Sequence, residues 1–482
     1  MDSSHETIYE TLVNTASLWP DNLAVADEHG TLTYQELYKQ VEDLKDLLLA
    51  SGLRKGSHAV LITKNNRHFI VGLYALLACE CVVMPLPPYQ KAGEFKKALN
   101  EAHIEFILAD TPDHNIYGAT SKKIALSNHD LHLNAVRSEC LSFISFLDHA
   151  AVMRFTSGTT GDAKCVILSH QSVLERIEAA NEGLQLTAHD RVIWVLPMAY
   201  HFIVSIILYV RYGCGIIICE DFMAENILDK AIEHQGTFLY ASPMHIRLLA
   251  ACKKDYVLPK LTKVVSTTTA ITPSICKAFQ GKYRTPVSQA FGIIEVGLPI
   301  INLQHSSDHP EAVGYALPAY TVRVVDETFQ PVPVNEVGHL AIKGPGMFDG
   351  YLTPPTLRQD VLKEGWFMTG DLAAMTKEGL IEIKGRTKNV INVSGNKVFP
   401  DEVEVVINSF PGIENSKVYS HNHPLMGEIV AAEIVLYDKN ERFDSEELIL
   451  HCRQHLSSFK VPQRITIVSD IALTGSGKIK RG

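Results

Sequence analysis

The sequence of 482 residues has no block of basic residues and no uninterrupted apolar stretch long enough to cross a membrane. Lysine and arginine number 44 against 54 aspartates and glutamates, and the net charge of −10 argues against nucleic-acid binding as the main task. The most apolar stretch, residues 202–219, is interrupted by Arg211 and Gly213, so we expect a buried helix followed by a strand. The first residues are polar and acidic, and no signal peptide is expected. These absences favour a globular cytoplasmic protein without a membrane span.

Closely spaced cysteines of the kind that bind metal are also scarce. The nine cysteines are scattered, and only Cys79 and Cys81 lie close together. A metal or redox pair is possible there, but no second pair accompanies it. Reduced thiols buried in a cytoplasmic protein are the favoured interpretation.

The hydrophobic pattern of the first half predicts strands that alternate with helices. Thr33 and Glu36 have capping-box spacing at the start of a helix that Gly52 ends. Such alternation predicts doubly wound, parallel sheets covered by helices on both faces. The expected strands are 59–63, 81–84, 105–109, 192–196, 215–219, 237–240 and 263–266.

The pattern changes after residue 320 and again after residue 384. Hairpin strands around Pro331 and Pro333 predict a small β-barrel-like subdomain or a distorted sheet. A short polar link, residues 385–389, precedes a separate α+β pattern. We therefore predict an α/β multidomain chain with a large N-terminal domain (1–384), a hinge (385–389) and a small mobile C-terminal domain (390–482).

The most informative segment is residues 155–164, which read Phe-Thr-Ser-Gly-Thr-Thr-Gly-Asp-Ala-Lys. Glycines allow successive N–H groups to point into one concavity, hydroxyls add donors, and Lys164 adds a mobile charge. The spacing differs from that of a Walker A loop, because only two residues separate the glycines. An ordinary surface loop is the alternative, but apolar flanks that look like buried strands favour a polyphosphate site.

Four further motifs follow this loop in order along the chain. They are Phe-Gly-Ile-Ile-Glu (291–295), Trp-Phe-Met-Thr-Gly-Asp (366–371), Gly-Arg (385–386) with Gly-Asn-Lys-Val-Phe-Pro-Asp-Glu-Val-Glu (395–404), and Leu-Thr-Gly-Ser-Gly-Lys (473–478). Their order and spacing resemble the adenylate-forming superfamily of acyl-CoA synthetases, adenylation domains and luciferases. The resemblance extends from about residue 33 to residue 480.

The resemblance implies a two-step reaction. A carboxylate attacks the α-phosphate of ATP to give an acyl-adenylate and pyrophosphate, and a thiol then displaces AMP. ATP, Mg²⁺ and either coenzyme A or a phosphopantetheine arm are the implied cofactors. The implied partners are a small carboxylic acid and coenzyme A or an acyl carrier protein, in a monomer or homodimer.

The resemblance also implies roles for individual residues. Lys478, Glu295 and Lys164 are the expected catalytic residues, with Lys478 between the carboxylate and the α-phosphate and Glu295 on Mg²⁺. Lys388 occupies the hinge position and Gly395 the thiol tunnel. The expected ATP- and AMP-binding residues are Thr156, Ser157, Gly158, Thr159, Thr160, Gly161, Lys164, Thr269, Ala270, Phe291, Gly292, Ile294, Asp371 and Arg386.

The chain departs from the family pattern at several of these positions. Ala163 replaces a usual proline, Cys165 replaces a usual glycine, and bulkier residues stand at 267–270. Ile294 replaces a threonine whose hydroxyl bonds the α-phosphate, a loss of about 1.5–3 kcal/mol. A relative that has lost catalysis would explain Ile294 but not the retention of Lys478. A kinase-type phosphotransferase would explain the loop at 155–164 but not the other four motifs.

The acyl pocket is expected after a Pro-Met segment at 197–198. Tyr200 and His201 stand where amino-acid-activating relatives carry an aspartate, which disfavours an α-amino acid. His201 is either a pocket gate or a buried core histidine. The expected pocket residues are Tyr200, His201, Ile203, Val204, Thr268 and Gly297. These favour a fatty or other apolar acid and coenzyme A, with an aryl acid or a carrier protein as alternatives.

Overall fold

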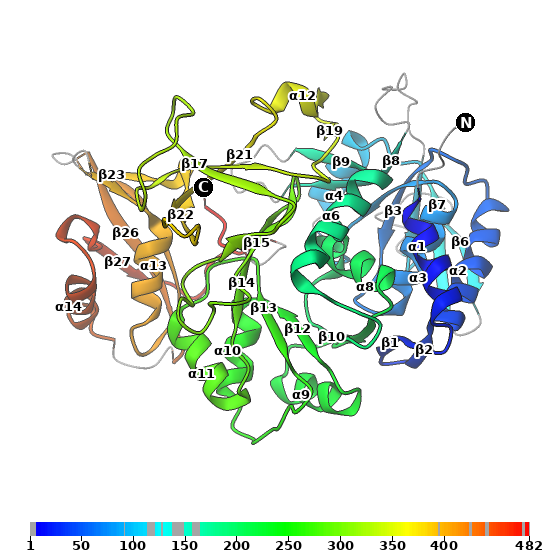
Figure 1. Ribbon diagram of the computed structural model, residues 1–482, viewed down its shortest axis with the longest axis horizontal. Coiled ribbons are helices and arrows are strands. Elements are labelled where there is room, and N and C mark those ends of the chain that lie inside the picture. Colours follow the sequence, from blue (N-terminus) through cyan, green and yellow to red (C-terminus); the bar gives the residue numbers. More distant parts are fainter. Residues whose placement is uncertain are drawn as a thin grey trace.

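A computed structural model describes residues 6–90, 92–112, 121–126, 129–136, 149–156, 164–393, 396–423, 427–438, 443–474 and 478–481. Two nine-stranded sheets, a four-stranded sheet and a five-stranded sheet organise this part of the chain (Figure 1). No helix in these ranges is both long enough and apolar enough to cross a membrane.

The first large sheet is parallel at its centre and antiparallel at its edges. Its parallel strands carry almost only buried side chains, as expected for a sheet covered on both faces. In spatial order the strands are β16 (Tyr315–Ala316), β15 (Gly297–Ile301), β14 (Ser288–Ile293), β13 (Lys263–Ser266), β12 (Phe238–Ala241), β10 (Arg191–Trp194), β11 (Gly215–Ile218), β1 (Leu23–Asp27) and β2 (Gly30–Thr33).

The second large sheet has the same plan. Its parallel centre is flanked by an antiparallel hairpin on one side and by three antiparallel strands on the other. In spatial order the strands are β20 (Thr356–Leu357), β19 (Gly350–Tyr351), β9 (Cys165–Ser169), β8 (Ala150–Phe155), β4 (Val82–Pro85), β3 (His58–Ile62), β5 (Phe106–Ala109), β7 (His129–Ala135) and β6 (Ser121–Leu126).

Two smaller sheets complete the described fold. The predicted small β-subdomain is a four-stranded antiparallel sheet of β17 (Thr321–Val325), β18 (Gly338–Lys343), β21 (Phe367–Met375) and β22 (Ile381–Arg386). The last sheet comprises β24 (Asn396–Val398), β23 (Ile391–Val393), β26 (Gly427–Leu436), β25 (Ile413–His423) and β27 (Arg464–Ile467).

Helices cover these sheets, and α2 begins with the cap that the sequence predicts. At the start of α2, Thr33 and Glu36 form the expected capping box. The helices are α1 (Ile8–Leu18), α2 (Tyr34–Leu49), α3 (Arg67–Ala78), α4 (Ala92–Glu101), α6 (His170–Leu184), α7 (Met198–His201), a π-helix (Ile203–Ile207), α8 (Leu208–Arg211), α9 (Ala224–Glu233), α10 (Pro243–Ala251), α11 (Pro273–Tyr283), α12 (Arg358–Val361), α13 (Pro400–Asn408), α14 (Ser445–His455) and the 3₁₀ turns Thr387–Asn389 and Ser458–Lys460.

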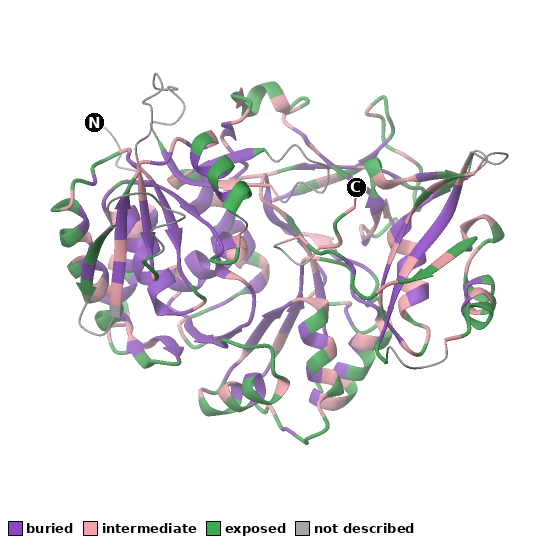
Figure 2. Cartoon of the chain, turned by 180° about the vertical axis from the view of Figure 1, so that it is seen from behind, coloured by how far each residue is buried: buried purple, intermediate pink, exposed green. Residues whose placement is uncertain are grey.

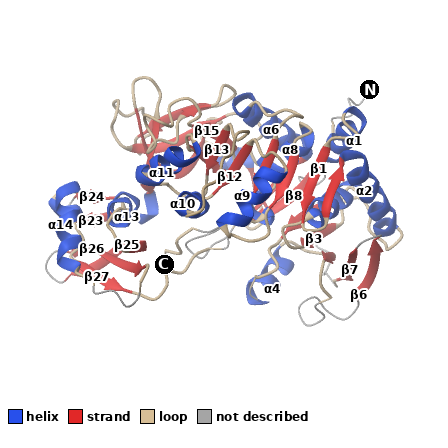
Figure 3. Ribbon diagram, turned by 90° about the horizontal axis from the view of Figure 1, so that it is seen from below, coloured by secondary structure: helices blue, strands red, loops and turns tan. Residues whose placement is uncertain are grey.

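One apolar core joins the two large sheets. Leu61 of β3 and Val192 of β10 belong to it, together with Val71 of α3 and Ile177 of α6. Figure 2 shows the buried strands surrounded by exposed helix faces. The last sheet and its helices have their own core, which includes Ile391 and Val461. In Figure 3 these elements lie at one end of the molecule, and the C-terminus lies beside them. The predicted α/β architecture, with a large N-terminal part and a small α+β part, is confirmed.

A buried ion pair connects the two large sheets. Asp27 ends β1 of the first sheet, and Arg67 begins α3, which packs on the second. The Nη2 atom of Arg67 lies 2.5 Å from Oδ1 of Asp27, and the Arg67 amide donates to Oδ2 at 2.9 Å. Burial raises the pKa of Asp27, but hydrogen bonds and charge from Arg67 outweigh burial and lower that pKa overall.

We expect Arg67→Met to lower the free energy of unfolding by about 3–5 kcal/mol, because it leaves the fully buried Asp27 side chain unpaired. Urea denaturation measures this change. Lys55→Met breaks an exposed pair with Glu80 and serves as the control, with an expected loss below about 1 kcal/mol. Because the folded-state pKa of Asp27 is lowered, its stabilisation is present above about pH 4 and is lost as the pH falls further. An Arg67→Met loss equal to that of Lys55→Met would contradict the assignment.

Candidate functional site

The predicted polyphosphate loop connects two buried strands, β8 and β9, which form an antiparallel hairpin. At the ends of the loop, the Thr156 amide donates to the Lys164 carbonyl at 2.9 Å, and the Lys164 amide donates to Oγ1 of Thr156 at 3.1 Å. The hairpin therefore fixes both ends of the loop, as its apolar flanks predicted. Ser157, Gly158, Thr159, Thr160 and Gly161 lie outside the described residues.

Tyr351 connects the loop lysine to the predicted metal ligand. The Lys164 ammonium lies 4.5 Å from the centroid of the Tyr351 ring. The Tyr351 hydroxyl donates to Oε1 of Glu295 at 3.2 Å. Burial, followed by the charge of Glu295, raises the pKa of Tyr351, so this hydroxyl stays protonated and remains a donor. Our sequence analysis missed Tyr351; its only signal was an aromatic residue directly after Gly350.

A buried arginine holds the turn that carries Glu295. The Arg176 guanidinium donates to the carbonyl of Ile294 at 2.8 Å and to that of Gly346 at 2.8 Å. The Glu295 carbonyl accepts from the Phe348 amide at 2.8 Å. Gly297 follows with φ of +107°, and a Cβ there would lie 3.2 Å from Cβ of Arg176. Glycine is therefore required at Gly297 for both its conformation and its neighbour.

The chemistry of Glu295 suits Mg²⁺ shared with a nucleotide. No group of three or more histidine, cysteine, aspartate or glutamate side chains gathers around one metal position in the described ranges. Mg²⁺ is commonly held by one or two carboxylates with substrate phosphates and water completing its coordination. A single carboxylate fixed by Tyr351 fits that type of site.

The remaining predicted nucleotide residues lie at the ends of β13 and β14. Thr269 and Ala270 are exposed, and they follow the predicted acyl-pocket residue Thr268, which has a positive φ of +83°. Phe291 is half-buried on β14. A Cβ at Gly292 would lie 2.8 Å from the Gly297 carbonyl oxygen, so this position admits only glycine without a shift of the backbone.

Asp371 and Arg386 face each other across paired strands. They are register partners on β21 and β22, and Nε of Arg386 lies 2.7 Å from Oδ1 of Asp371. The Asp371 amide donates to Oγ1 of Thr369 at 3.0 Å. Oδ2 of Asp371 is buried and accepts no hydrogen bond from any described residue. Burial raises the pKa of Asp371, whereas Arg386 and Lys478 oppose that rise. A buried acceptor without a donor fits a hydroxyl-bearing ligand such as ribose.

The C-terminal tail brings Lys478 to the same place. Burial is the largest cause that lowers the pKa of Lys478, and the charges of Arg386 and Arg154 lower it further, against the opposing effects of Asp371 and Glu295. The Lys478 amide donates to Oγ1 of Thr474 at 3.1 Å. The structure thus gathers Lys478, Glu295, Asp371 and Arg386 from distant parts of the sequence.

Arg481 anchors this tail to α13. Its guanidinium lies 2.7 Å from Asp401 and 2.7 Å from Glu404, and it donates to the Val418 carbonyl at 2.8 Å. Burial raises the pKa of Glu404 to about 7, and the charge of Arg481 opposes that rise. The Lys480 amide donates to the Ala472 carbonyl at 2.8 Å, so hydrogen bonds hold the backbone on both sides of Lys478.

The predicted acyl-pocket residues begin on α7 and continue into the π-helix. Tyr200 and His201 end α7, and Ile203 and Val204 open the π-helix, where Val204 has non-helical angles. Burial lowers the pKa of His201 to about 3, and the charges of Arg154 and Lys478 lower it further. His201 is therefore neutral, and its buried Nε2 has no partner among the described residues.

Of the predicted hinge and tunnel residues, the structure describes only the hinge lysine. Lys388 is exposed in the 3₁₀ turn Thr387–Asn389, and Gly395 lies outside the described residues. Gly385 has φ of +144°, and a Cβ there would lie 3.1 Å from Oδ2 of Asp401. The link therefore passes close to the start of α13.

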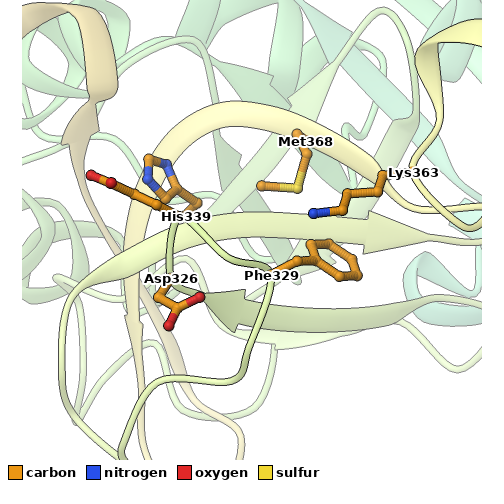
Figure 4. A pocket seen from close by; sticks show the side chains of 6 residues that line it. Asp326, Phe329, His339, Lys363 and Met368 are labelled. Carbon is orange, nitrogen blue, oxygen red and sulfur yellow. The ribbon is translucent and has the colours of Figure 1, made fainter.

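A cavity of about 300 Å³ lies elsewhere, on the four-stranded sheet. Figure 4 shows the Lys363 ammonium and Phe329 beside Met368, and the ammonium lies 4.6 Å from the ring centroid. None of the predicted site residues lines this cavity. Its lining residues are Asp326, Glu327, Phe329, His339, Lys363 and Met368.

Comparison with known proteins gives matches along the whole chain. A family model described as AMP-binding enzyme matches residues 12–352, and a model of the C-terminal domain of such enzymes matches residues 402–478. The chain is 25% identical to a feruloyl-CoA synthase of an Amycolatopsis species (98% of this chain, 96% of the relative) and 26% identical to a medium-chain fatty-acid–CoA ligase of Escherichia coli (97% and 88%). An o-succinylbenzoate CoA synthetase structure from Bacillus subtilis, in complex with its acyl-adenylate, has the same fold, with a TM-score of 0.86, 20% identity and coverage of 99% of this chain and 97% of that one.

We expect Arg481→Met to loosen the tail that carries Lys478, because the substitution leaves Glu404 buried without its cation. Hydrogen exchange at the amides of Lys478 and Lys480 reports this directly, and we expect it to accelerate at least tenfold. Arg464→Met removes an exposed arginine that contacts His421 in the same part of the molecule and serves as the control. Unchanged exchange in Arg481→Met would show that Arg481 does not anchor the tail.

Proposed function

Because the chain belongs to the AMP-binding enzyme family, as its motifs predicted, we propose that it activates a carboxylic acid with ATP and transfers the acyl group to a thiol. The observation that carries this proposal is the meeting of Lys478 with the Asp371–Arg386 pair and Glu295. A carboxylate oxygen attacks the α-phosphorus and pyrophosphate leaves. A thiol sulfur then attacks the acyl carbon and AMP leaves.

The residues around this position have separate tasks in the first step. Asp371 accepts ribose hydroxyls through its unpartnered oxygen, and Arg386 fixes the orientation of Asp371. Lys478 offsets the repulsion between the carboxylate and the α-phosphate as the two anions approach. Phe291 stacks on adenine. The loop with Thr156 and Lys164 receives the β- and γ-phosphates.

Glu295 would hold Mg²⁺, which when bound shields phosphate charge. Tyr351 keeps the Glu295 carboxylate oriented and also supports Lys164 through its ring. One tyrosine thereby couples the positions of the metal ligand and the loop lysine. Ile294 supplies no side-chain donor to the α-phosphate, so adenylation depends more strongly on the neighbouring cations.

We infer a fatty or other apolar acid as the substrate and coenzyme A as the acceptor. Ile203 is buried, Val204 is half-buried, and His201 is neutral, so none of these predicted pocket residues supplies an acidic group to pair with an α-ammonium. An aryl acid is the second candidate, and the feruloyl-CoA synthase among the relatives supports it. A carrier-protein acceptor would present the same pantetheine thiol. Eight cysteines of the described residues are free thiols, which supports a cytoplasmic setting.

A pyrophosphate-exchange screen across fatty, aryl and amino acids tests this function. We expect ATP- and acid-dependent exchange, release of AMP rather than ADP, and thioester formation with coenzyme A. Repeating the second step with a carrier protein distinguishes the two acceptors. Absence of exchange with every acid, in a protein that binds AMP, would show a non-catalytic relative.

We expect Lys478→Ala to abolish pyrophosphate exchange and to spare thioester formation from a supplied acyl-adenylate, since only the first step needs the ammonium at the α-phosphate. Lys480→Ala is the matched control, because Lys480 is exposed two residues away. Since the pKa of Lys478 is lowered, exchange should decline with rising pH at a lower pH than for an ordinary lysine. Persistent exchange in Lys478→Ala would reject this role.

We further propose that residues 1–384 and 390–482 act as separate domains, joined by a hinge at 385–389. The separate core of the last sheet supports this division, as does the exposed turn at Lys388. In one orientation the C-terminal domain presents Lys478 to the carboxylate and the α-phosphate. In another it would present the segment around Gly395 to the thiol.

Lys388→Pro should restrict this reorientation, because proline fixes φ in the link. With Lys478 already at the site, we expect the thioester-forming step to lose more activity than pyrophosphate exchange. The two half-reactions, measured separately, give the comparison. Equal losses would contradict a hinge at Lys388.

A further inference from the structure

Arg154 is a charged residue of the site that the roles above do not use. It is the penultimate residue of β8, paired with Val166 of β9 directly before the predicted phosphate loop. Its neighbours in the hairpin are buried apolar side chains, including Met153 and Cys165. A guanidinium in such a strand is costly to bury unless an anion balances its charge.

No described residue supplies that balance by direct contact. The Nε atom of Arg154 is buried and has no hydrogen-bond partner among the described residues. The charge of Glu295 favours the charged form of Arg154, but the described residues form no ion pair with its side chain. Burial lowers the pKa of Arg154 to about 10, a value at which the guanidinium remains charged at neutral pH. A charged fork with free donors is suited to bind a carboxylate through two oxygens.

The position of Arg154 indicates which anion this is. Its guanidinium carbon lies 5.7 Å from the centroid of the Tyr200 ring, on the helix that opens the predicted acyl pocket. Its charge also influences His201 on the same helix and Lys478 on the tail. Arg154 therefore lies against the acyl-pocket helix, and its charge acts on the lysine that the proposed function assigns to the reacting groups. Lys164, in contrast, lies against Tyr351.

Resting on the proposed function, we propose that Arg154 is a further substrate-binding residue, whose guanidinium binds the reacting carboxylate of the acid beside the ammonium of Lys478. The cation–π contact with Tyr200 orients the guanidinium toward the pocket. Two cations then hold the carboxylate for attack on the α-phosphate, at a site where Ile294 supplies no hydroxyl. Arg154 is needed in the first step only, because the carboxylate has become a mixed anhydride before the thiol arrives.

Arg154→Met and Arg154→Lys test this assignment by pyrophosphate exchange with the best acid of the screen. We expect Arg154→Met to raise the KM for the acid about 10- to 100-fold, the effect of losing charge-assisted hydrogen bonds, and to leave the KM for ATP within about twofold. The KM for the acid in Arg154→Lys should lie between those of the wild type and Arg154→Met, because lysine keeps the charge but lacks the two-pronged guanidinium. Thioester formation from a supplied acyl-adenylate should remain near the wild-type rate. Arg453→Met, an exposed arginine on α14, is the matched control.

A binding measurement keeps the test decisive if turnover is lost. Thermal stabilisation by AMP shows that each variant is folded with an intact nucleotide site. Inhibition of thioester formation from a supplied acyl-adenylate, which does not need the first step, is then compared for the acid and for the primary alcohol of the same chain. The wild type should prefer the acid, and Arg154→Met should lose this preference.

An unchanged KM for the acid in Arg154→Met would overturn the inference. A matching rise in the KM for ATP would also overturn it, because Arg154 would then bind phosphate. These outcomes presuppose wild-type exchange. Absence of exchange in the wild type would instead reject the proposed function, so the two failures are distinguishable.

Discussion

The charge of Lys478 is the constraint on which the rest of the site depends. Burial, and then the charges of neighbouring cations, lower the pKa of this ammonium, so it needs nearby anions to remain charged. Asp371 and Glu295 supply the negative charge. Asp371 belongs to the small antiparallel sheet, and Glu295 lies between β14 and β15 of a large sheet. The position of the tail therefore depends on how both sheets are placed.

Rigid supports make this placement possible. The Asp27–Arg67 pair connects the first strand of one large sheet to a helix of the other. Arg176 holds the turn before Glu295, and Arg481 anchors the tail beyond Lys478. In each case a guanidinium binds carbonyls or carboxylates in a buried place, where a fixed fork of donors preserves direction better than a flexible ammonium.

Much of the fold could be predicted from periodicity alone. Parallel strands buried on both faces appear in the sequence as continuous apolar runs, and a capping box at Thr33 marks the start of the helix that follows. The motifs also identified the family, because five short strings in order are improbable by chance. Contacts such as Tyr351 with Glu295 and Lys164 were not predictable, since they join residues 56 and 187 positions apart, and the sequence does not state how the strands beside them pair.

The place of Arg154 in the site was also not predictable from the sequence. In the sequence it is one charged residue at the end of an apolar run, and nothing nearby distinguishes it from a solvated side chain. The tertiary structure places it against Tyr200 and within the electrostatic reach of Lys478, which is 324 residues away. The sequence by itself determined the local conformations and the types of chemical group available, because these depend on residues a few positions apart. Only the tertiary structure decided which charges share one buried place, because that depends on how strands from distant segments pair and on which side chains lose contact with water.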